Sequence, residues 1–506
     1  MDPISRVIAA GAAGAGAAEA VPLYADDVFS TYVHEGTGSN RTITNGIDLS
    51  GKGGLVWIKA RNSSTQTHAL YDTSRGVSSG LNSATSTAAT STNNTVFRAF
   101  NSDGFEIGSS NTVNGSSSID YVSWTFREAP GFFDIVTWTG DTNSTKTLNH
   151  NLGSVPGCIM VKNLSLSASD WVVYHRSLGN TKYIELNTNF DEDTSSSAWN
   201  DTDPTSTQFT VGSFSNSNNS QYVAYLWAHD DQSFGANSDE AIIKCDSYTG
   251  NGSTDGPTVN LGFEPQWLMI KNTGENSTYG SWMIFDNIRG VVDGNDQALV
   301  ANRADAENTT YTGGSSGTDW IEFTSTGFKI QGPGYTAVDT NAIKYIYIAI
   351  RRSHKPPESG TDVFSPSTQV GTVPNFAANF PVDFAIRLLT AGGNTTYSQM
   401  AVTRLTGEKF LATSQDNAEA TPSGFSIDWD YMDGWGDLGG SGHGLSFKRA
   451  PGFFDVVTYT GTGSDLTLLS SFVVSIASSS TTTGSAMGSS SGSVSSTIGS
   501  GSGSGT

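Results

Sequence analysis

Cysteine is almost absent from this sequence of 506 residues, which contains only Cys158 and Cys245. Two cysteines cannot build the disulfide framework on which small secreted domains depend, so that class of protein is excluded. Both cysteines lie in apolar, strand-like stretches, and we therefore expect two buried free thiols. Such sparse use of cysteine suits a protein made in a reducing cytoplasm.

Positive charge is also scarce. Lysine and arginine together number 26 against 48 aspartate and glutamate residues, which gives a net charge of −22. Nucleic-acid binders need clustered Lys and Arg to replace the counterions of the phosphate backbone, so we expect no nucleic acid among the partners. An acidic surface of this kind mainly keeps a large, exposed protein soluble.

Long hydrophobic runs are missing as well. Residues 1–25 form an N-terminal arm built mainly from glycine and alanine. A membrane span needs about 20 predominantly apolar residues, so we expect no membrane insertion. Arg6 and the stretch Ala18-Glu19-Ala20 allow the alternative of a secretory signal, but Asp2 and the glycines favour a flexible arm.

One phrase of the sequence occurs twice. The six residues APGFFD at 129–134 return at 450–455, and the two prolines lie 451 − 130 = 321 residues apart. This distance suits about three domains, since domains cluster near 100–150 residues.

Weaker copies of the flanking strands fill the interval. A strand-like segment that carries a phenylalanine returns at Phe105, Phe209, Phe328 and Phe425. An apolar strand that ends in lysine returns at Lys59, Lys162 and Lys271. The same strands in the same order predict four tandem modules.

The resulting division of the chain has seven parts. They are the N-terminal arm 1–25, module 1 (26–128), module 2 (129–234), module 3 (235–356), a diverged module 4 (357–449), an incomplete fifth module (450–476) and a Ser/Gly-rich tail (477–506). The tail cannot bury a core, because it contains almost nothing but small polar residues and glycine.

The modules read as all-β, as tandem β-sandwiches or jelly rolls of a lectin-like kind. Short runs rich in aromatic and β-branched residues alternate with Gly, Asn, Ser and Thr, and no stretch shows a convincing helical period. Residues 121–127 alternate apolar and polar side chains, which predicts one buried and one wet face. Each module, at about 100 residues, is long enough to hold a core of its own.

Signs of catalysis are few. The stretches 313–317 and 488–492 match the Gly-x-Ser-x-Gly pattern, but neither lies between a strand and a helix, as a nucleophile elbow requires. No zinc, phosphate-loop or paired-cysteine motif occurs. We predict no catalytic residues, no cofactor, no metal ligands and no enzymatic activity.

Two acidic loops allow alternatives. Asp191, Glu192 and Asp193, with Asp201 and Asp203, could offer hard oxygen ligands to calcium, as could the loop 428–434, although solvated loops are the simpler interpretation of both.

The second loop also carries aromatic rings beside carboxylates, a combination that can stack on sugars. The candidate carbohydrate contacts are Trp429, Tyr431 and Trp435. The alternative is that these rings cap the core of module 4.

Several long phrases resemble a known family. They include FREAPGFFDIVTWTGD, HNLGSVPG, DWVVYHRSL, FEPQWLMIK and IAIRRSHKPPE, and the resemblance covers about residues 22–465. The sequence is similar to a repeated domain of unknown function in virion proteins of marine tailed phages. This resemblance implies a β-sandwich like the legume-lectin and laminin-type jelly rolls, in a fibre or another external part of the virion.

The expected function is that of a structural virion protein, a tail fibre or tail-associated appendage that presents lectin-like modules for host attachment. The alternatives are a head-decorating or head-fibre protein and a polysaccharide depolymerase. Expected partners are other virion proteins, a host-surface glycan or protein, and further copies of the chain, in a trimer by the resemblance to phage fibres.

The repeated joint at 450–455 supports one local prediction. Two further strands cannot form an independent sandwich. Phe453 and Phe454 should therefore pack against module 4, on the side of residues 380–389.

Overall fold

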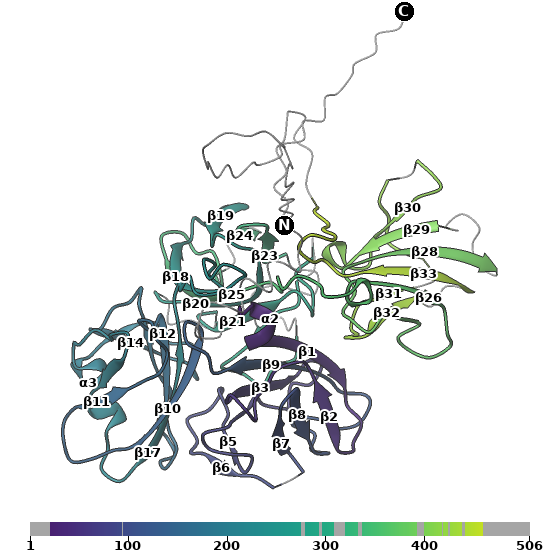
Figure 1. The fold of residues 1–506 in the computed structure, drawn as a ribbon. Coiled ribbons are helices and arrows are strands. Elements are labelled where there is room, and N and C mark those ends of the chain that lie inside the picture. Colours follow the sequence, from purple (N-terminus) through teal and green to yellow (C-terminus); the bar gives the residue numbers. More distant parts are fainter. Residues whose placement is uncertain are drawn as a thin grey trace, which may run out of the picture.

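The computed structural model describes residues 21–93, 95–274, 279–292, 296–307, 319–331, 336–391, 399–416, 418–423, 426–437 and 441–458. The predicted all-β fold is confirmed, because the described residues form antiparallel sheets joined by loops and a few short helical turns. Figure 1 shows four β-sandwiches in tandem, three of them grouped around α2 (Ala25–Val28) and the fourth set to one side. None of the helices in the described ranges has the length and apolar character that a membrane crossing requires.

Each sandwich pairs one large sheet with one small sheet. In module 1 the large sheet has the order β1 (Phe29–Glu35), β9 (Asp120–Arg127), β3 (Gly54–Ala60), β4 (Ala69–Asp72), and the small sheet β2 (Arg41–Thr44), β8 (Gly104–Ile107), β7 (Phe97–Asn101), with a separate pair β5 (Ser79–Gly80) and β6 (Thr90–Ser91). In module 2 the large sheet is β10 (Phe133–Thr139), β17 (Gln221–Trp227), β12 (Cys158–Asn163), β13 (Val172–His175), β14 (Lys182–Glu185), β15 (Asp193–Thr194), and the small sheet is β11 (Lys146–Asn149) and β16 (Gln208–Val211), with the short helix α3 (Ser196–Trp199) before β16.

Modules 3 and 4 repeat this plan. In module 3 the large sheet is β18 (Ile243–Thr249), β25 (Lys344–Arg351), β20 (Pro265–Asn272), β21 (Trp282–Asp286), β22 (Leu299–Val300), and the small sheet β19 (Asp255–Asn260), β24 (Gly327–Gln331), β23 (Ile321–Thr324). In module 4 the large sheet is β26 (Phe364–Thr368), β33 (Ser441–Phe447), β28 (Phe384–Ala391), β29 (Gln399–Thr403), β30 (Phe410–Ala412), and the small sheet β27 (Phe376–Ala377), β32 (Gly434–Asp437), β31 (Ile427–Asp428). Short 3₁₀ turns lie at Ser213–Ser215, Gly360–Asp362 and Arg404–Thr406.

The strand registers align the modules residue by residue. In every large sheet the last long strand lies between the first and the third, so Phe126 of β9 is opposite both Phe29 and Leu55. Trp227, Ile350 and Phe447 hold the same position in β17, β25 and β33. Residues can therefore be compared between modules by their place in the ladder.

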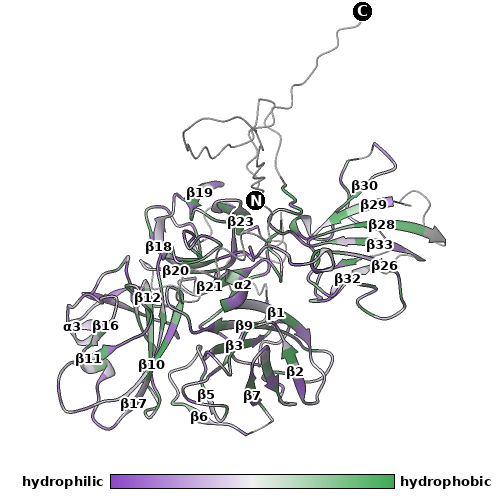
Figure 2. Cartoon of the chain, viewed as in Figure 1, coloured by the Kyte–Doolittle hydropathy of each residue, from purple (hydrophilic) through white to green (hydrophobic). Residues whose placement is uncertain are grey.

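One hydrophobic core joins modules 1, 2 and 3. It contains side chains from all three large sheets, among them Trp57, Trp124, Met160, Tyr225 and Met269. Figure 2 shows hydrophobic stretches along strands such as β9 and β12. Buried residues of both strands belong to this shared core. Modules 1 and 3 each have a second core between their two sheets, and module 4 has a core of its own.

The shared core corrects one expectation from the sequence and extends another. Residues 121–127 have no wet face, because Ser123 and Thr125 are as fully buried as Trp124. Modules 1 and 3 keep cores of their own between their two sheets, but their large sheets also enter the shared core, and the core of module 2 is continuous with it. The physical reason is the same in both cases: a large sheet of the ring has its small sheet on one face and neighbouring modules on the other.

The chain enters module 1 and leaves module 3 at one place. The carboxylate of Asp26 in α2 accepts hydrogen bonds from the Ser353 hydroxyl and from the backbone N–H groups of His354, at 2.9 Å, and Lys355, at 3.1 Å. The entry and exit segments are thus tied together, which closes the three modules into a ring.

Module 4 is attached to this ring by ion pairs. The Arg449 guanidinium makes two hydrogen bonds to the carboxylate of Glu264, at 2.7 and 2.9 Å. The prediction for the repeated joint is confirmed for Phe454, whose ring packs on Phe384 and Phe447 with centroids 5.5 and 5.2 Å apart, whereas Phe453 is 38% exposed. The rest of the predicted fifth module beyond residue 458, the tail and residues 1–20 of the arm lie outside the described residues.

Candidate functional site at the module interfaces

The interfaces between modules 1, 2 and 3 use the same positions in every module. The first set of contacts between modules is made by backbone carbonyl groups, each two residues beyond a strand-ending lysine. There the carbonyl oxygens accept N–H groups from a neighbouring module: Arg61 from Glu307 at 2.7 Å, Leu164 from Ala89 at 3.1 Å, and Thr273 from Glu192 at 3.0 Å. Module 1 thus contacts module 3, module 2 contacts module 1, and module 3 contacts module 2.

The second set of contacts is made by a ring at the start of the fourth strand of each module, either its first residue or the residue before it. Ring N–H groups donate to carbonyls in the same cyclic order: His68 Nε2 to Val300 at 3.0 Å, Trp171 Nε1 to Asn82 at 3.1 Å, and Trp282 Nε1 to Glu185 at 2.8 Å. Because a carbonyl can only accept, His68 carries its proton on Nε2, and its Nδ1 accepts from the indole of Trp57. The two sets together give the ring an approximate threefold symmetry.

The third set of contacts is made by side chains within the strands of the large sheets. The Tyr225 hydroxyl donates to Asp72 at 2.7 Å, and the Trp124 indole donates to Asp286 at 3.0 Å. At the corresponding place between modules 2 and 3, His175 Nε2 donates to the carbonyl of Tyr347 at 3.1 Å. The symmetry is therefore broken at this one interface, where a neutral histidine replaces a carboxylate.

The two carboxylates are neutralised by arginines three residues later in the chain. Arg75 Nε lies 2.5 Å from Asp72, and Arg289 Nε lies 2.6 Å from Asp286. Module 2 has Leu178 at this position and needs no cation, because burial lowers the pKa of His175 to about 4. Charge and counter-charge are present or absent together at each interface.

The repeated lysines are buried at the same interfaces. The ammonium of Lys162 donates to the carbonyl of Ser86 in module 1 at 3.0 Å, and that of Lys271 to the carbonyl of Phe190 in module 2 at 2.7 Å. Lys59 donates to carbonyls of its own module. Burial lowers the pKa of Lys59 and of Lys162 to about 8, and that of Lys271 to about 7.

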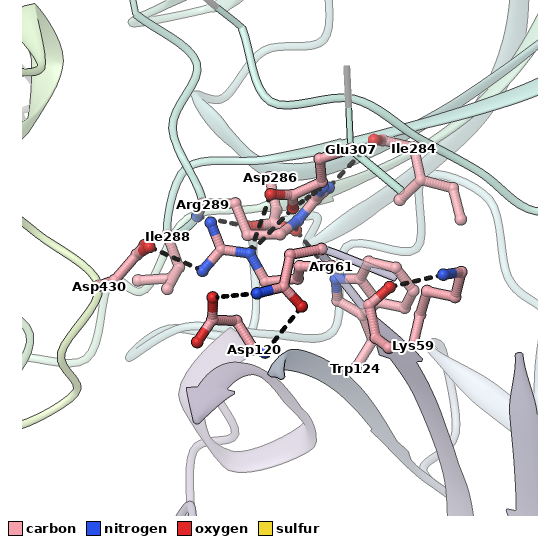
Figure 3. A network of polar contacts seen from close by, with 12 residues as sticks. Lys59, Arg61, Asp120, Trp124, Ile284, Asp286, Ile288, Arg289, Glu307 and Asp430 are labelled. Atoms are coloured by element: carbon pink, nitrogen blue, oxygen red, sulfur yellow. Dashed lines mark hydrogen bonds and ion pairs between the residues drawn. The ribbon is translucent and has the colours of Figure 1, made fainter. Parts of the chain in front are cut away.

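A network of charged groups lies where modules 1, 3 and 4 meet (Figure 3). Arg61 is held between Glu307 of module 3 and Asp430 of module 4, each at 3.0 Å, and Arg289 also reaches Glu307 at 2.9 Å. Burial acts to raise the pKa of Glu307, but the two arginines outweigh it and lower that pKa. The ions of this network satisfy one another, so it holds three modules together.

The predicted carbohydrate contacts lie in different environments. Trp435 is fully buried, stacked on Phe376 with centroids 4.5 Å apart, and donates to the Ser446 hydroxyl. Trp429 is also buried, with its indole N–H on the carbonyl of Gly407. These two rings belong to the core of module 4, as the structural alternative expected.

Tyr431 is half-buried, and its hydroxyl donates to Asp428 at 3.0 Å. It is the one candidate of the three with an accessible ring, and its contact with a sugar stays a prediction.

The acidic loops show no arrangement for calcium. Asp191, Asp193, Asp201 and Asp203 are exposed, and Glu192 is paired with Lys182. Within the part of the chain that the structure describes, no group of three or more His, Cys, Asp or Glu side chains could hold a metal ion. The two Gly-x-Ser-x-Gly stretches, at 313–317 and 488–492, lie outside the described residues.

Cys158 and Cys245 are buried free thiols, as the sequence predicted. They lie close together at the interface of modules 2 and 3, since a side chain at Gly157 would meet the Cys245 sulfur.

The sequence did not reveal that these residues meet. Two signals were present: a lysine at the end of three matched strands, and the Asp-x-x-Arg pattern at 72–75 and 286–289. A charged residue repeated inside matched apolar segments indicates a shared structural role, whereas the partners Glu307 and Asp430 lie in segments without a repeat.

A family model described as "Domain of unknown function (DUF7483)" matches residues 25–353. The match covers 353 − 25 + 1 = 329 of the 506 residues. It begins at α2 and ends at Ser353, the residue that binds Asp26, so the matched region is the closed ring of modules 1 to 3. No curated protein matches the chain.

Proposed function

The chain belongs to the DUF7483 domain family, whose description assigns no function, and we propose that it is a structural virion protein of a tailed bacteriophage. In this proposal it is a tail fibre or tail-associated appendage that presents its β-sandwiches to the host surface. The resemblance of its repeated phrases to virion proteins of marine tailed phages supports the assignment to a virion.

The observation that carries the structural role is the closed ring. Three sandwiches share one core, and buried charged groups such as Asp286 and Arg61 bond to a neighbouring module. A body of this kind resists deformation, because moving one module breaks its contacts with both neighbours. Rigidity suits an external part of a particle that must bear contact with a cell.

The partners in this proposal are other virion proteins, further copies of the chain in a trimer, and a glycan or protein of the host surface. Tyr431 is the residue through which a sugar contact is proposed, since its ring is accessible and has a carboxylate beside it. The acidic surface, with a net charge of −22, supports a soluble, exposed location.

Immunogold labelling of purified virions tests the proposal directly. Label along the tail or its appendages is the expected result, and label confined to the head lattice would instead establish the head-decorating alternative. A copy number in the hundreds per particle would point to the head as well.

The depolymerase alternative has a separate test. Purified protein should release no reducing sugar from host polysaccharide. Release that persists in the purified wild-type protein would overturn the non-enzymatic proposal.

A further inference from the structure

The large sheet of module 4 has an apolar face. In modules 1 to 3 the equivalent face is covered by the neighbouring modules of the ring. In module 1 the equivalent face is formed by Leu55, Trp57, Leu70, Leu81, Trp124 and Phe126, all of which lie in the shared core. The ladders place Phe384, Ile386, Ala401, Leu411, Leu445 and Phe447 at the same positions of module 4. All six residues are apolar, as in the ring.

These six residues remain half-buried or exposed in the described structure. Leu411 is 48% exposed, whereas its equivalent Leu81 is 4% exposed. Along β33, and along β28 from Phe384 to Leu388, buried residues alternate with more exposed ones, so one face is covered by the module's own core and the other is not. In β3, β12 and β20, by contrast, every residue is buried.

The polar positions of the face have changed together. The carboxylate position of Asp72 and Asp286 is Thr403 in module 4, and the arginine position of Arg75 and Arg289 is Thr406. The lysine position, Lys59 in module 1, is Leu388. The face has thus lost the charged groups whose burial requires a matched partner, and it can be covered by surfaces like itself.

We propose that this face binds the same face of two further copies of the chain, and that three copies of module 4 form a second threefold ring. The internal ring is the argument for the occupant: faces with these positions cover one another three at a time in modules 1 to 3. Exposed apolar faces of this kind mark interaction sites on soluble proteins. The aromatic cluster of Phe384, Phe447 and Phe454 would border the interface, as Phe126 and Phe133 do in the ring.

The inference rests on the proposed function only in expecting association between copies. It concerns the purified protein, so its failure would leave the location on the virion open, and label on the head would leave the association unaffected.

The test measures the mass of the full-length protein by light scattering and mass photometry. We expect about 160 kDa, three times the 53.3 kDa of one chain. Leu411→Glu places a charge on the face and should reduce the mass to that of a single chain. Leu166→Glu is the matched control, since Leu166 is also 48% exposed but lies in module 2, and this variant should stay trimeric.

A second variant guards against loss of folding in the first. Ala401→Cys places a thiol on the face, and a short bis-maleimide should then join chains into covalent dimers and trimers, while Leu166→Cys should yield none. A wild-type protein that is a single chain at tens of micromolar would overturn the proposal. So would a trimer that Leu411→Glu leaves intact, or an absence of cross-links at position 401. A single chain whose face is covered by its own later residues is one of the results that would overturn it.

Discussion

Asp286 shows how a single buried charge is stabilised in the ring. Its carboxylate accepts from the Trp124 indole of module 1, from Arg289 Nε and from the backbone of Arg289. An ion pair without exposure to water is costly to break, because removal of one partner leaves the other charge buried. Residues of this kind are therefore the most sensitive points of the fold.

Replacing Asp286 by alanine should lower the free energy of unfolding by about 3–5 kcal/mol, since Arg289 loses its closest counter-charge inside the protein. Urea unfolding followed by tryptophan fluorescence measures this loss. Asp255→Asn is the control, because Asp255 pairs with Lys329 at the surface and its side chain is largely exposed. Equal unfolding midpoints for Asp286→Ala and the wild type would show that the pair does not stabilise the ring.

Lys271 should make the stability depend on alkaline pH. Burial lowers its pKa from 10.5 to about 7 in the folded protein. Between pH 7 and 10.5 the unfolded chain therefore binds more protons at this site than the folded one, so this site makes stability rise with pH across that window. Below pH 7 the lysine is protonated in both states and contributes no further change.

Lys271→Met should weaken this rise, because the group that titrates is gone. Urea midpoints of both proteins at several pH values from 7 to 10 give the comparison. Parallel curves for the two proteins would contradict the assignment of a lowered pKa to Lys271.

At the scale of elements, the short helix α2 has a larger role than its four residues suggest. It is too short to be stable by itself, and it is held because Asp26 binds residues 353–355 at the end of module 3. The first strand of the ring and its last segment lie more than 300 residues apart in the chain, so contacts of this kind hold them together.

Asp26→Ala should loosen this closure, with a cost of about 1–3 kcal/mol for hydrogen bonds to a charged group. Hydrogen exchange should become faster in α2, β1 and residues 353–355, while exchange in the small sheets of modules 2 and 3 stays unchanged. Uniform acceleration over the whole ring would mean that α2 does not act as a local closure.

At the scale of the whole molecule, the shared core predicts how the chain unfolds. Modules 1, 2 and 3 bury side chains in one cluster, whereas the core of module 4 is separate. We therefore expect two calorimetric transitions, one for the ring and one for module 4, because residues that share a core unfold together.

Two substitutions assign these transitions. Trp57→Ala, in the shared core, should lower the midpoint temperature of the ring transition, and Trp435→Ala, in module 4, that of the other. Each substitution should reduce the free energy of unfolding of its unit by about 3–5 kcal/mol. Four independent transitions, or a loss confined to module 1 in the Trp57→Ala variant, would contradict a shared core.

The strands and their order could be predicted from the sequence, because each module repeats the same periodic segments and the same joint. The ring could not. Its contacts join residues such as Arg61 and Glu307, 246 positions apart, and no local pattern encodes such a pair. One local signal was present in β3: four consecutive apolar residues, Leu55 to Ile58, exceed what a strand with one wet face requires.

The candidate site followed a similar division. The pairing of aromatic rings with carboxylates at 428–435 is visible in the sequence, but burial decides whether a ring is free to bind. Trp435 donates its indole N–H to a residue of the large sheet, and only the closed sandwich shows that its faces are occupied.

The broken symmetry at His175 has a consequence for how this protein can change. In a ring of three identical chains, any substitution enters all three interfaces at once and must suit each of them. Here the three interfaces are encoded separately, so one of them could exchange an aspartate and its arginine for a histidine and a leucine while the other two kept their charges. Because one chain contains all three interfaces, a single substitution changes one interface at a time, and the two unchanged interfaces can offset a defect in the third.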